Sequence, residues 1–186
     1  MVPLDPVEEE RRRKRNFRLR LVPTAFLLVL MAGSVFLPQV GVRGAESFGR
    51  SLLRAGQFFL TANSQAAAFA GLDQALVAMG INVTYLGMAA NEVGLALGIA
   101  SFWVVAAEEV GRWMRRVLMV AGWMLALSAP LVVTGYRLLE SAGVPSYLGV
   151  AWLPTLLAGL IMITGGLVAR KRLTSTWYWS NPELIT

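Results

Sequence analysis

Long uncharged stretches separated by short charged segments are the main pattern of this chain. No charged residue occurs in 21–42, 117–136 or 147–169, and 84–107 contains a single one, Glu92. At a rise of 1.5 Å per residue, each stretch can cross the hydrocarbon core of a bilayer, which is about 30 Å thick. The pattern therefore predicts four membrane-spanning helices at about these positions.

Residues 64–81 form a further apolar segment, rich in alanine, which is either a short span or a helix at the membrane surface. The basic residues favour one topology. If 64–81 does not cross, thirteen of the 17 basic residues lie on one side, whereas a crossing divides them eight to nine. Because basic residues concentrate on the cytoplasmic side, we expect an interfacial or re-entrant helix at 64–81. Both termini are then cytoplasmic, and a bacterial inner (plasma) membrane is the expected location.

The predicted fold class is an all-α integral membrane protein with four transmembrane helices, an N-terminal cytoplasmic helix and an interfacial helix between spans one and two. Its parts are a basic cytoplasmic head (1–20), a membrane domain (21–172) and a cytoplasmic aromatic tail (173–186). We expect the basic head to face anionic lipid, with docking to an acidic partner as the alternative. Its basic residues are Arg11, Arg12, Arg13, Lys14, Arg15, Arg18 and Arg20. The head lacks the repeated aromatic residues on which bases stack, so no nucleic-acid partner is expected.

Composition excludes several classes of protein. The hydrophobic fraction is 56%, and the charged fraction of 15% is well below the value of about 25% in soluble proteins. These two fractions exclude an ordinary soluble protein. The chain has no His and no Cys, which removes the commonest ligands of haem, zinc and iron–sulfur clusters. Phosphate-binding glycine loops and the serine-hydrolase motif are also missing. We expect no cofactor of its own, although contact with lipid or a quinone remains open.

Glu92 is the candidate for chemistry, because it is the one ionisable residue well inside a predicted span. A carboxylate at that depth is costly unless it is neutral, paired or hydrated, and such residues often mark functional sites. One interpretation is a carboxylate that carries a proton or contacts a quinone. The other is a structural group hydrogen-bonded within the protein.

Small and polar residues follow one face of the same predicted span. These helix-packing candidates are Gly87, Ala90, Asn91, Gly94 and Gly98. Their spacing allows a neighbouring helix to approach closely, either within the chain or from a partner subunit. Glu92 lies on the opposite face, so the helix can contact two different neighbours.

Three aromatic residues close to the C-terminus, Trp177, Tyr178 and Trp179, are the candidates for anchoring. Aromatic side chains of this kind suit the membrane–water interface. We expect them to anchor the tail at the interface, with docking to a partner as the alternative.

The runs Phe69-Ala70-Gly71, Leu76 to Ile81 and Gly87 to Gly98, with Glu92 inside the last, resemble the DoxX family of small four-span membrane proteins. Members of that family often have a short helix after span one, then a span with a glutamate followed by glycines. The resemblance covers about residues 65–130, and the first span departs from the family pattern. It implies a subunit linked to quinone-dependent sulfur or redox chemistry, with Glu92 as the one position carried over.

Together these features predict an accessory or structural subunit of a larger membrane complex, without catalytic activity of its own. Its expected partners are the lipid bilayer and other membrane subunits. Two alternatives remain open: a DoxX-like subunit of a quinone-linked oxidoreductase, and a proton-coupled transport component that uses Glu92.

Overall fold

The structure is a computed structural model that is mostly helical. It describes the backbone of residues 6–42, 45–46, 54–64, 69–106 and 111–180, and the side chains of 20–42, 55–64, 69–106 and 111–168. The helices are α1 (Pro6–Phe36), α2 (Arg54–Ser64), α3 (Gln74–Ser101), α4 (Arg112–Ser141) and α5 (Trp152–Ser180). A short 3-10 helix, η2 (Phe102–Val105), follows α3, and the strands are β1 (Val40–Val42), β2 (Ala45–Glu46) and β3 (Ser146–Leu148).

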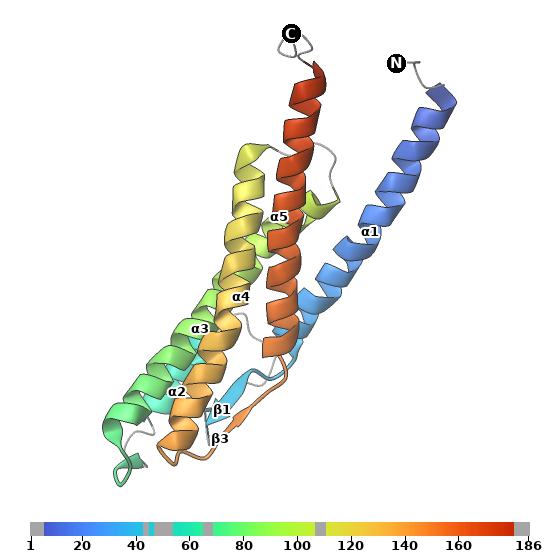
Figure 1. Ribbon diagram of the computed structural model, residues 1–186. Helices are drawn as coiled ribbons and strands as arrows, with labels where there is room; N and C mark the ends of the chain where they lie inside the picture. Colours follow the sequence, from blue (N-terminus) through green and yellow to red (C-terminus); the bar gives the residue numbers. More distant parts are fainter. Residues whose placement is uncertain (1–5, 43–44, 47–53, 65–68, 107–110, 181–186) are drawn as a thin grey trace.

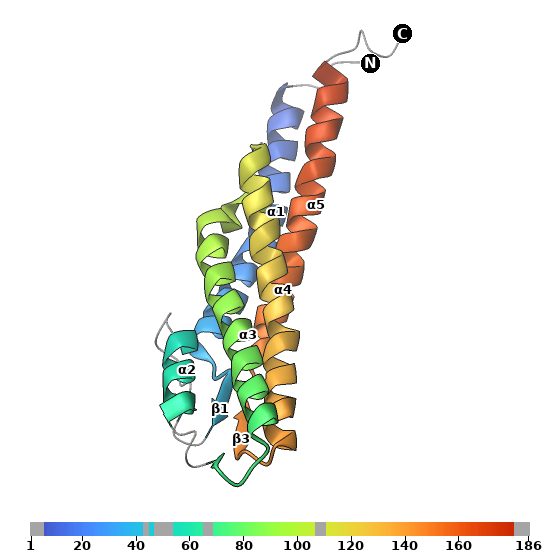
Figure 2. The ribbon, with the colours of Figure 1, turned by 90° about the vertical axis from the view of Figure 1, so that its left-hand side faces the viewer.

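The four long helices run lengthwise through an elongated molecule (Figures 1 and 2). One end, here called the terminal end, holds the start of α1, the start of α4 and the end of α5. The opposite end, here called the sheet end, holds α2, β1, β3 and the turn from α4 toward β3. The chain therefore begins and finishes its described helices at the same end of the molecule.

Helices α3 and α4 pack against each other through glycines spaced seven residues apart. Gly80, Gly87 and Gly94 of α3 face Leu139, Val132 and Leu125 of α4, respectively. A Cβ atom at Gly87 would lie 2.9 Å from the backbone nitrogen of Val132, which is closer than carbon and nitrogen atoms pack. A seven-residue repeat is typical of helices that wind around each other in a left-handed sense. Glycine thus allows two backbones to meet where any side chain would separate them.

Helix α5 packs on α4 in the same way at Gly159. A Cβ atom at Gly159 would lie 2.5 Å from the backbone nitrogen of Ala126. Gly122 of α4 meets the carbonyl oxygen of Gly159 from the other side. Small residues therefore bring α3, α4 and α5 together as neighbouring layers.

Local signals begin α3 and end α4. Oδ1 of Asp73 accepts hydrogen bonds from the backbone N–H groups of Ala75 and Leu76, at 3.0 and 3.2 Å, and so caps the first turn of α3. At the end of α4, Gly143 has a φ angle of +81°, a conformation that glycine adopts without a steric penalty. The following Val144 donates its N–H to the carbonyl of Leu139 at 3.0 Å, which closes the last turn.

A three-stranded antiparallel sheet joins the segment after α1 to the segment before α5. The strand order is β2-β1-β3, with Val40 opposite Leu148 and Val42 opposite Ser146. The pairing continues beyond the strands, since Gly149 donates its N–H to the carbonyl of Gln39 at 2.6 Å. The mostly helical structure agrees with the expected helical class, and this short sheet is an addition that the sequence did not predict, because its strands are too short to show an alternating pattern.

Two apolar clusters form the interior. The cluster near the sheet end joins β1, α2 and the adjoining halves of α3 and α4, and includes Val40, Phe58, Ile81, Met88 and Leu139. The second cluster, nearer the terminal end, joins α1, α3, α4 and α5, and includes Leu27, Met31, Leu95, Leu125 and Met162. The two clusters meet where α1 ends and α5 begins.

The expected interfacial helix at 64–81 differs from the structure. Helix α2 ends at Ser64, residues 70–71 form a turn, and residues 74–81 are the first part of α3. The span expected at 84–107 corresponds to α3, which begins ten residues earlier, at Gln74. The α-helix ends at Ser101, where η2 follows it. The reason is the cap at Asp73, a local hydrogen bond that starts one continuous helix there.

The expected boundaries of the first and last spans also change. Helix α1 ends at Phe36 rather than at residue 42, because residues 40–42 pair with β3. The head and first span form one continuous helix from Pro6, and α5 runs without a break from Trp152 to Ser180, so it includes most of the expected tail.

Within the described residues, two helical segments are long and apolar enough to cross a membrane, Gln74–Val105 and Arg112–Ser141. In each, 39% of the most apolar window is buried inside the protein. The rest of each window is partly or fully exposed. The apolar described parts of α1 and α5 are shorter, Arg20–Phe36 and Trp152–Val168.

The glycine contacts predict an ordered series of stabilities. Gly87→Ala should lower the free energy of unfolding by about 1–3 kcal/mol, because its Cβ would press on the backbone of Val132. Gly98→Ala should cost less, since its nearest neighbour is the flexible end of Met162. Gly56→Ala is the control: open space surrounds it, and alanine favours a helix by up to about 1 kcal/mol. Unfolding in detergent, followed by circular dichroism, measures the series, and equal losses at Gly87 and Gly98 would contradict the packing.

Candidate functional site

Three buried polar side chains connect α1, α3 and α5 at the junction of the two apolar clusters. Ser34 Oγ donates to Asn91 Oδ1 at 3.0 Å and lies 2.6 Å from Thr155 Oγ1. Thr155 Oγ1 is also 2.8 Å from the carbonyl oxygen of Ala151 in its own helix. The exposed fractions of Ser34, Asn91 and Thr155 are 0, 3 and 2%. We call these three residues the polar cluster.

The hydrogens of the polar cluster can be assigned from the donors available. Each hydroxyl has one hydrogen, and the amide oxygen of Asn91 can only accept. Ser34 therefore gives its hydrogen to Asn91, and the Thr155 hydroxyl is the donor to Ser34, sharing its hydrogen with the carbonyl of Ala151. The cluster is neutral, and its chemistry is that of an interhelical hydrogen-bond network rather than of an acid or a base.

Glu92 lies on the next position of α3 and faces α2. Its Oε1 accepts a hydrogen bond of 2.8 Å from the backbone N–H of Ala55, in the first turn of α2. The first N–H groups of a helix have no partner inside the helix and carry a partial positive charge. A half-buried carboxylate from α3 therefore caps α2, a role that the sequence left open as one of two interpretations.

Helix α2 lies against α3 with its N-terminus at the height of Glu92. Its buried side chains are Ala55, Phe58 and Ala62, and the rings of Phe59 and Tyr85 are 4.9 Å apart. Since Tyr85 comes before Glu92 in α3, α2 runs from Glu92 toward the sheet end (Figure 2). The short helix thus begins deep beside α3 and returns to the end from which α3 starts.

The small-residue face expected on α3 is divided among three neighbouring helices. Gly87 and Gly94 contact α4, whereas Gly98 lies against Met162 of α5 and Asn91 bonds to α1. Ala90 is half-buried on the same helix. Within the described part, the contacts given above for this face and for Glu92 are with helices of the same chain.

Ser34 and Thr155 are site residues that the sequence interpretation missed. Each is a hydroxyl residue inside a stretch without charges. A serine or threonine can bond to its own helix backbone, as Ser128 does to the carbonyl of Leu125 at 2.8 Å, so its presence in a span does not indicate a partner. Their meeting depends on how α1 and α5 pack.

Several predicted site residues have side chains outside the described part. The first group is the basic head residues other than Arg20, and the backbone of this group lies in α1. The second group is Trp177, Tyr178 and Trp179, and its backbone lies in α5. In the described part, no group of three or more acidic, His or Cys side chains is placed to hold a metal ion.

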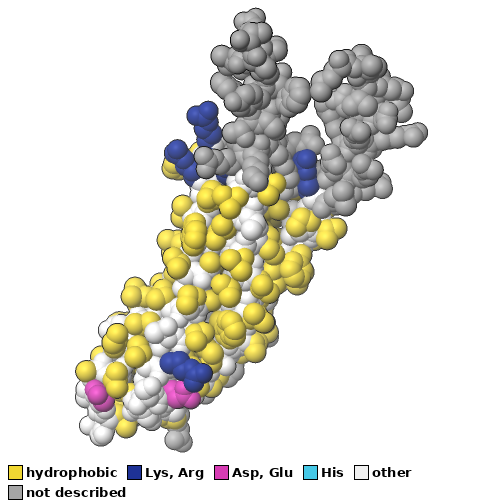
Figure 3. Space-filling model, viewed as in Figure 1, with side chains coloured by type: hydrophobic (Ala, Val, Ile, Leu, Met, Phe, Trp, Pro, Cys, Tyr) yellow, Lys and Arg dark blue, Asp and Glu magenta, His cyan; other side chains and the backbone are white. Residues whose placement is uncertain are grey.

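The outer surface is apolar between the two ends. Figure 3 shows apolar side chains over the middle of the molecule and charged side chains near its ends. Large apolar side chains that are more than two-fifths exposed include Val93, Ile99, Val120, Trp123, Leu127, Leu153 and Leu160. Continuous apolar surface of this kind marks contact with a membrane or another protein.

Comparisons of the chain with known protein families, with characterised proteins and with solved structures found no match.

The polar cluster predicts measurable coupling between α1 and α3. Ser34→Ala and Asn91→Ala should each destabilise the fold, and the double variant should lose less than the sum, with a coupling energy of about 0.5–2 kcal/mol. Ser128→Ala is the matched control, because the Ser128 hydroxyl bonds only within α4 among the described contacts. Unfolding in detergent gives the four stabilities of the cycle, and strict additivity would contradict the hydrogen bond.

Proposed function

We propose that this chain is an integral membrane protein with four spans and both termini in the cytoplasm, and that it is an accessory or structural subunit of a larger complex in a bacterial inner membrane. The observation that carries the structural role is the use of the polar groups inside the molecule. The polar cluster joins helices, and Glu92 caps α2. Its partners are lipid and other membrane subunits, without nucleic acid.

The exposed apolar surface supports placement in a bilayer. Arg116 and Arg137 of α4 are about 31 Å apart along the helix axis, which matches a hydrocarbon core of about 30 Å. Apart from Thr134, the exposed side chains between them are apolar, and they include Val120, Trp123 and Leu127. A soluble protein that exposed this surface would aggregate.

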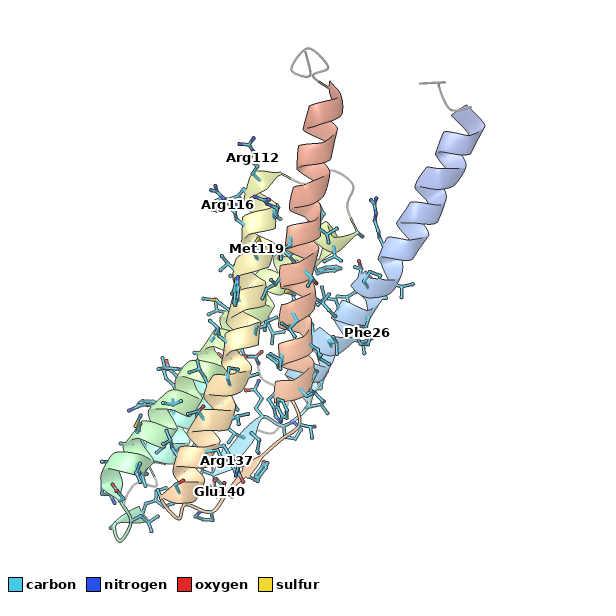
Figure 4. All side chains as sticks on the ribbon, viewed as in Figure 1. Phe26, Arg112, Arg116, Met119, Arg137 and Glu140 are labelled. Carbon is cyan, nitrogen blue, oxygen red and sulfur yellow. The ribbon has the colours of Figure 1, made fainter. Side chains whose placement is uncertain are left out.

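The arrangement of the ends supports the proposed orientation. Both α1 and α5 have their terminal parts at one end (Figure 1), together with Arg112 and Arg116 (Figure 4). The exposed charges described at the sheet end include the ion pair of Arg137 and Glu140. A basic terminal end agrees with a cytoplasmic location, because basic residues are retained on that side.

The quinone-linked and proton-linked alternatives depend on Glu92. Gly94 faces Leu125 and Gly87 faces Val132, so Glu92 lies at the height of the middle of α4. A proton-carrying carboxylate suits this depth. The bond from Ala55 favours the structural role, and the two roles differ in what happens when the carboxylate becomes an amide.

Glu92→Gln should be nearly silent under the proposed function. The amide oxygen still accepts the N–H of Ala55, and losing the charge at the helix terminus costs about 0.3–1 kcal/mol. Glu92→Leu is the matched variant, because it leaves that N–H without its acceptor and should cost about 1–3 kcal/mol. Stability in detergent and the activity of the co-purified complex are both measured. A Glu92→Gln complex that assembles fully but loses activity would refute the structural role and favour proton or quinone chemistry.

Single-cysteine labelling tests the topology, and the chain suits it because it contains no Cys. Cysteines at Ser64 and Ser141, exposed at the sheet end, should react with an impermeant maleimide from outside intact cells. Cysteines at Gly111 and Ser175 should react only after the membrane is opened. Labelling of Gly111 from outside would contradict the proposed orientation, and labelling of all four from one side would contradict the spans.

A further inference from the structure

The terminal end of α4 carries three arginines that form no ion pair with a described residue. Arg112 and Arg116 are exposed and point away from α5 and α1 (Figure 4), and Arg115 is half-buried. The ion pair found among the described side chains is that of Arg137 with Glu140, so none of these three is neutralised there. Nε of Arg115 is buried and has no acceptor within the described structure. Among the described residues, this concentrated positive charge has no counter-charge, and Glu108 and Glu109, which precede it in the sequence, lie outside the described part.

The position of these arginines on the helix adds to the positive potential. The N-cap of α4 is Gly111, which provides no side chain to accept from the first N–H groups. A helix N-terminus already carries a partial positive charge, so basic residues in the first turn and a half are unfavourable there. An external anion would neutralise the charge of the arginines and would also interact favourably with the partial positive charge of the uncapped helix terminus.

The residues below the arginines indicate the class of anion. Trp113, Arg116, Val120, Trp123 and Leu127 follow one another at three- and four-residue intervals, so they share one face of α4. Trp113 is 72% exposed, and Val120, Trp123 and Leu127 are 48, 53 and 55% exposed. The face therefore begins with an aromatic residue and a cation and continues as an apolar strip. We call it the α4 strip.

The length of the α4 strip matches one leaflet of a bilayer. From Arg116 to Leu127 the helix rises about 16 Å, which is close to half of the 30 Å hydrocarbon core. A free phosphate would use the arginines and leave the apolar strip unused. A phospholipid uses both, with its phosphate beside Arg112 and Arg116 and an acyl chain along the strip.

We propose that the α4 strip binds one anionic phospholipid of the leaflet at the terminal end, with its phosphate held by Arg112 and Arg116. Trp113 lies at the level of the headgroup, where an indole ring is favourable. The inference rests on the membrane placement proposed above. It adds a ligand class and a site that the structural role does not require.

The test uses the full chain purified in a neutral detergent and titrated with a short-chain phosphatidylglycerol, a short-chain phosphatidylcholine or inorganic phosphate. Native mass spectrometry counts the bound lipid. Phosphatidylglycerol should bind more tightly than phosphatidylcholine, and inorganic phosphate should not displace it. Arg116→Gln should weaken phosphatidylglycerol about fivefold, and Arg112→Gln with Arg116→Gln about thirtyfold. Arg137→Gln, which removes one charge at the other end, should leave binding unchanged.

Several results would overturn the proposal. These are equal affinity for the two lipids, unchanged binding in the double variant, or displacement by inorganic phosphate, which would indicate a free-anion site. A further such result is that phosphatidylglycerol is preferred only by the double variant Glu108→Gln, Glu109→Gln. That result would mean that these two acids neutralise the arginines in the unaltered chain. If no lipid binds and the arginines are needed instead to retain an acidic partner subunit, the arginines form a binding site for a protein. Extraction of cell membranes with alkaline carbonate tests the membrane placement separately, because an integral membrane protein stays in the pellet. A chain that stays in the pellet but fails the lipid test contradicts only the lipid site.

Discussion

Close contact between α3 and α4 organises the rest of the molecule, because glycines remove the side chains that would otherwise keep the two backbones apart. Gly80, Gly87 and Gly94 each receive an aliphatic side chain of α4. This pairing sets the height of every residue of α3 against α4, including Asn91 and Glu92. Helix α5 then packs on α4, α1 packs mainly on α5 and η2, and α2 packs on α3 near the sheet end.

The buried polar groups restrict how the helices of this apolar structure can be placed relative to one another. A buried polar group without a hydrogen bond costs several kcal/mol in an apolar medium, so each one restricts the arrangements that the helices can adopt. Ser34, Asn91 and Thr155 satisfy one another only when α1, α3 and α5 hold their observed heights. Glu92 does the same for α2 through Ala55. The bonds thus specify position, while most of the attraction comes from packing.

Charge separates the two ends of the molecule. At the sheet end, Arg137 and Glu140 lie 2.9 Å apart with exposed side chains, a pairing that neutralises charge but adds little stability. At the terminal end, Arg112 and Arg116 form no such pair with described residues. Between these ends the surface is apolar (Figure 3). One strip of α4 thus joins a cationic end to an apolar face, and this combination distinguishes lipid from either a simple ion or a purely apolar partner.

The sequence by itself determined the apolar helical segments and the basic N-terminal segment, and it indicated close packing at Gly87, Gly94 and Gly98, because each is recorded in residue type and spacing along one helix. It also singled out Glu92, since a lone acid in an apolar stretch is visible without a structure. Only the tertiary structure decided what these residues meet. The interaction of Glu92 with Ala55, the meeting of Ser34 with Asn91 and Thr155, and the pairing of β1 with β3 join residues far apart in the chain. No local pattern encodes such contacts, because the free energy that selects them comes from packing whole helices and strands against one another.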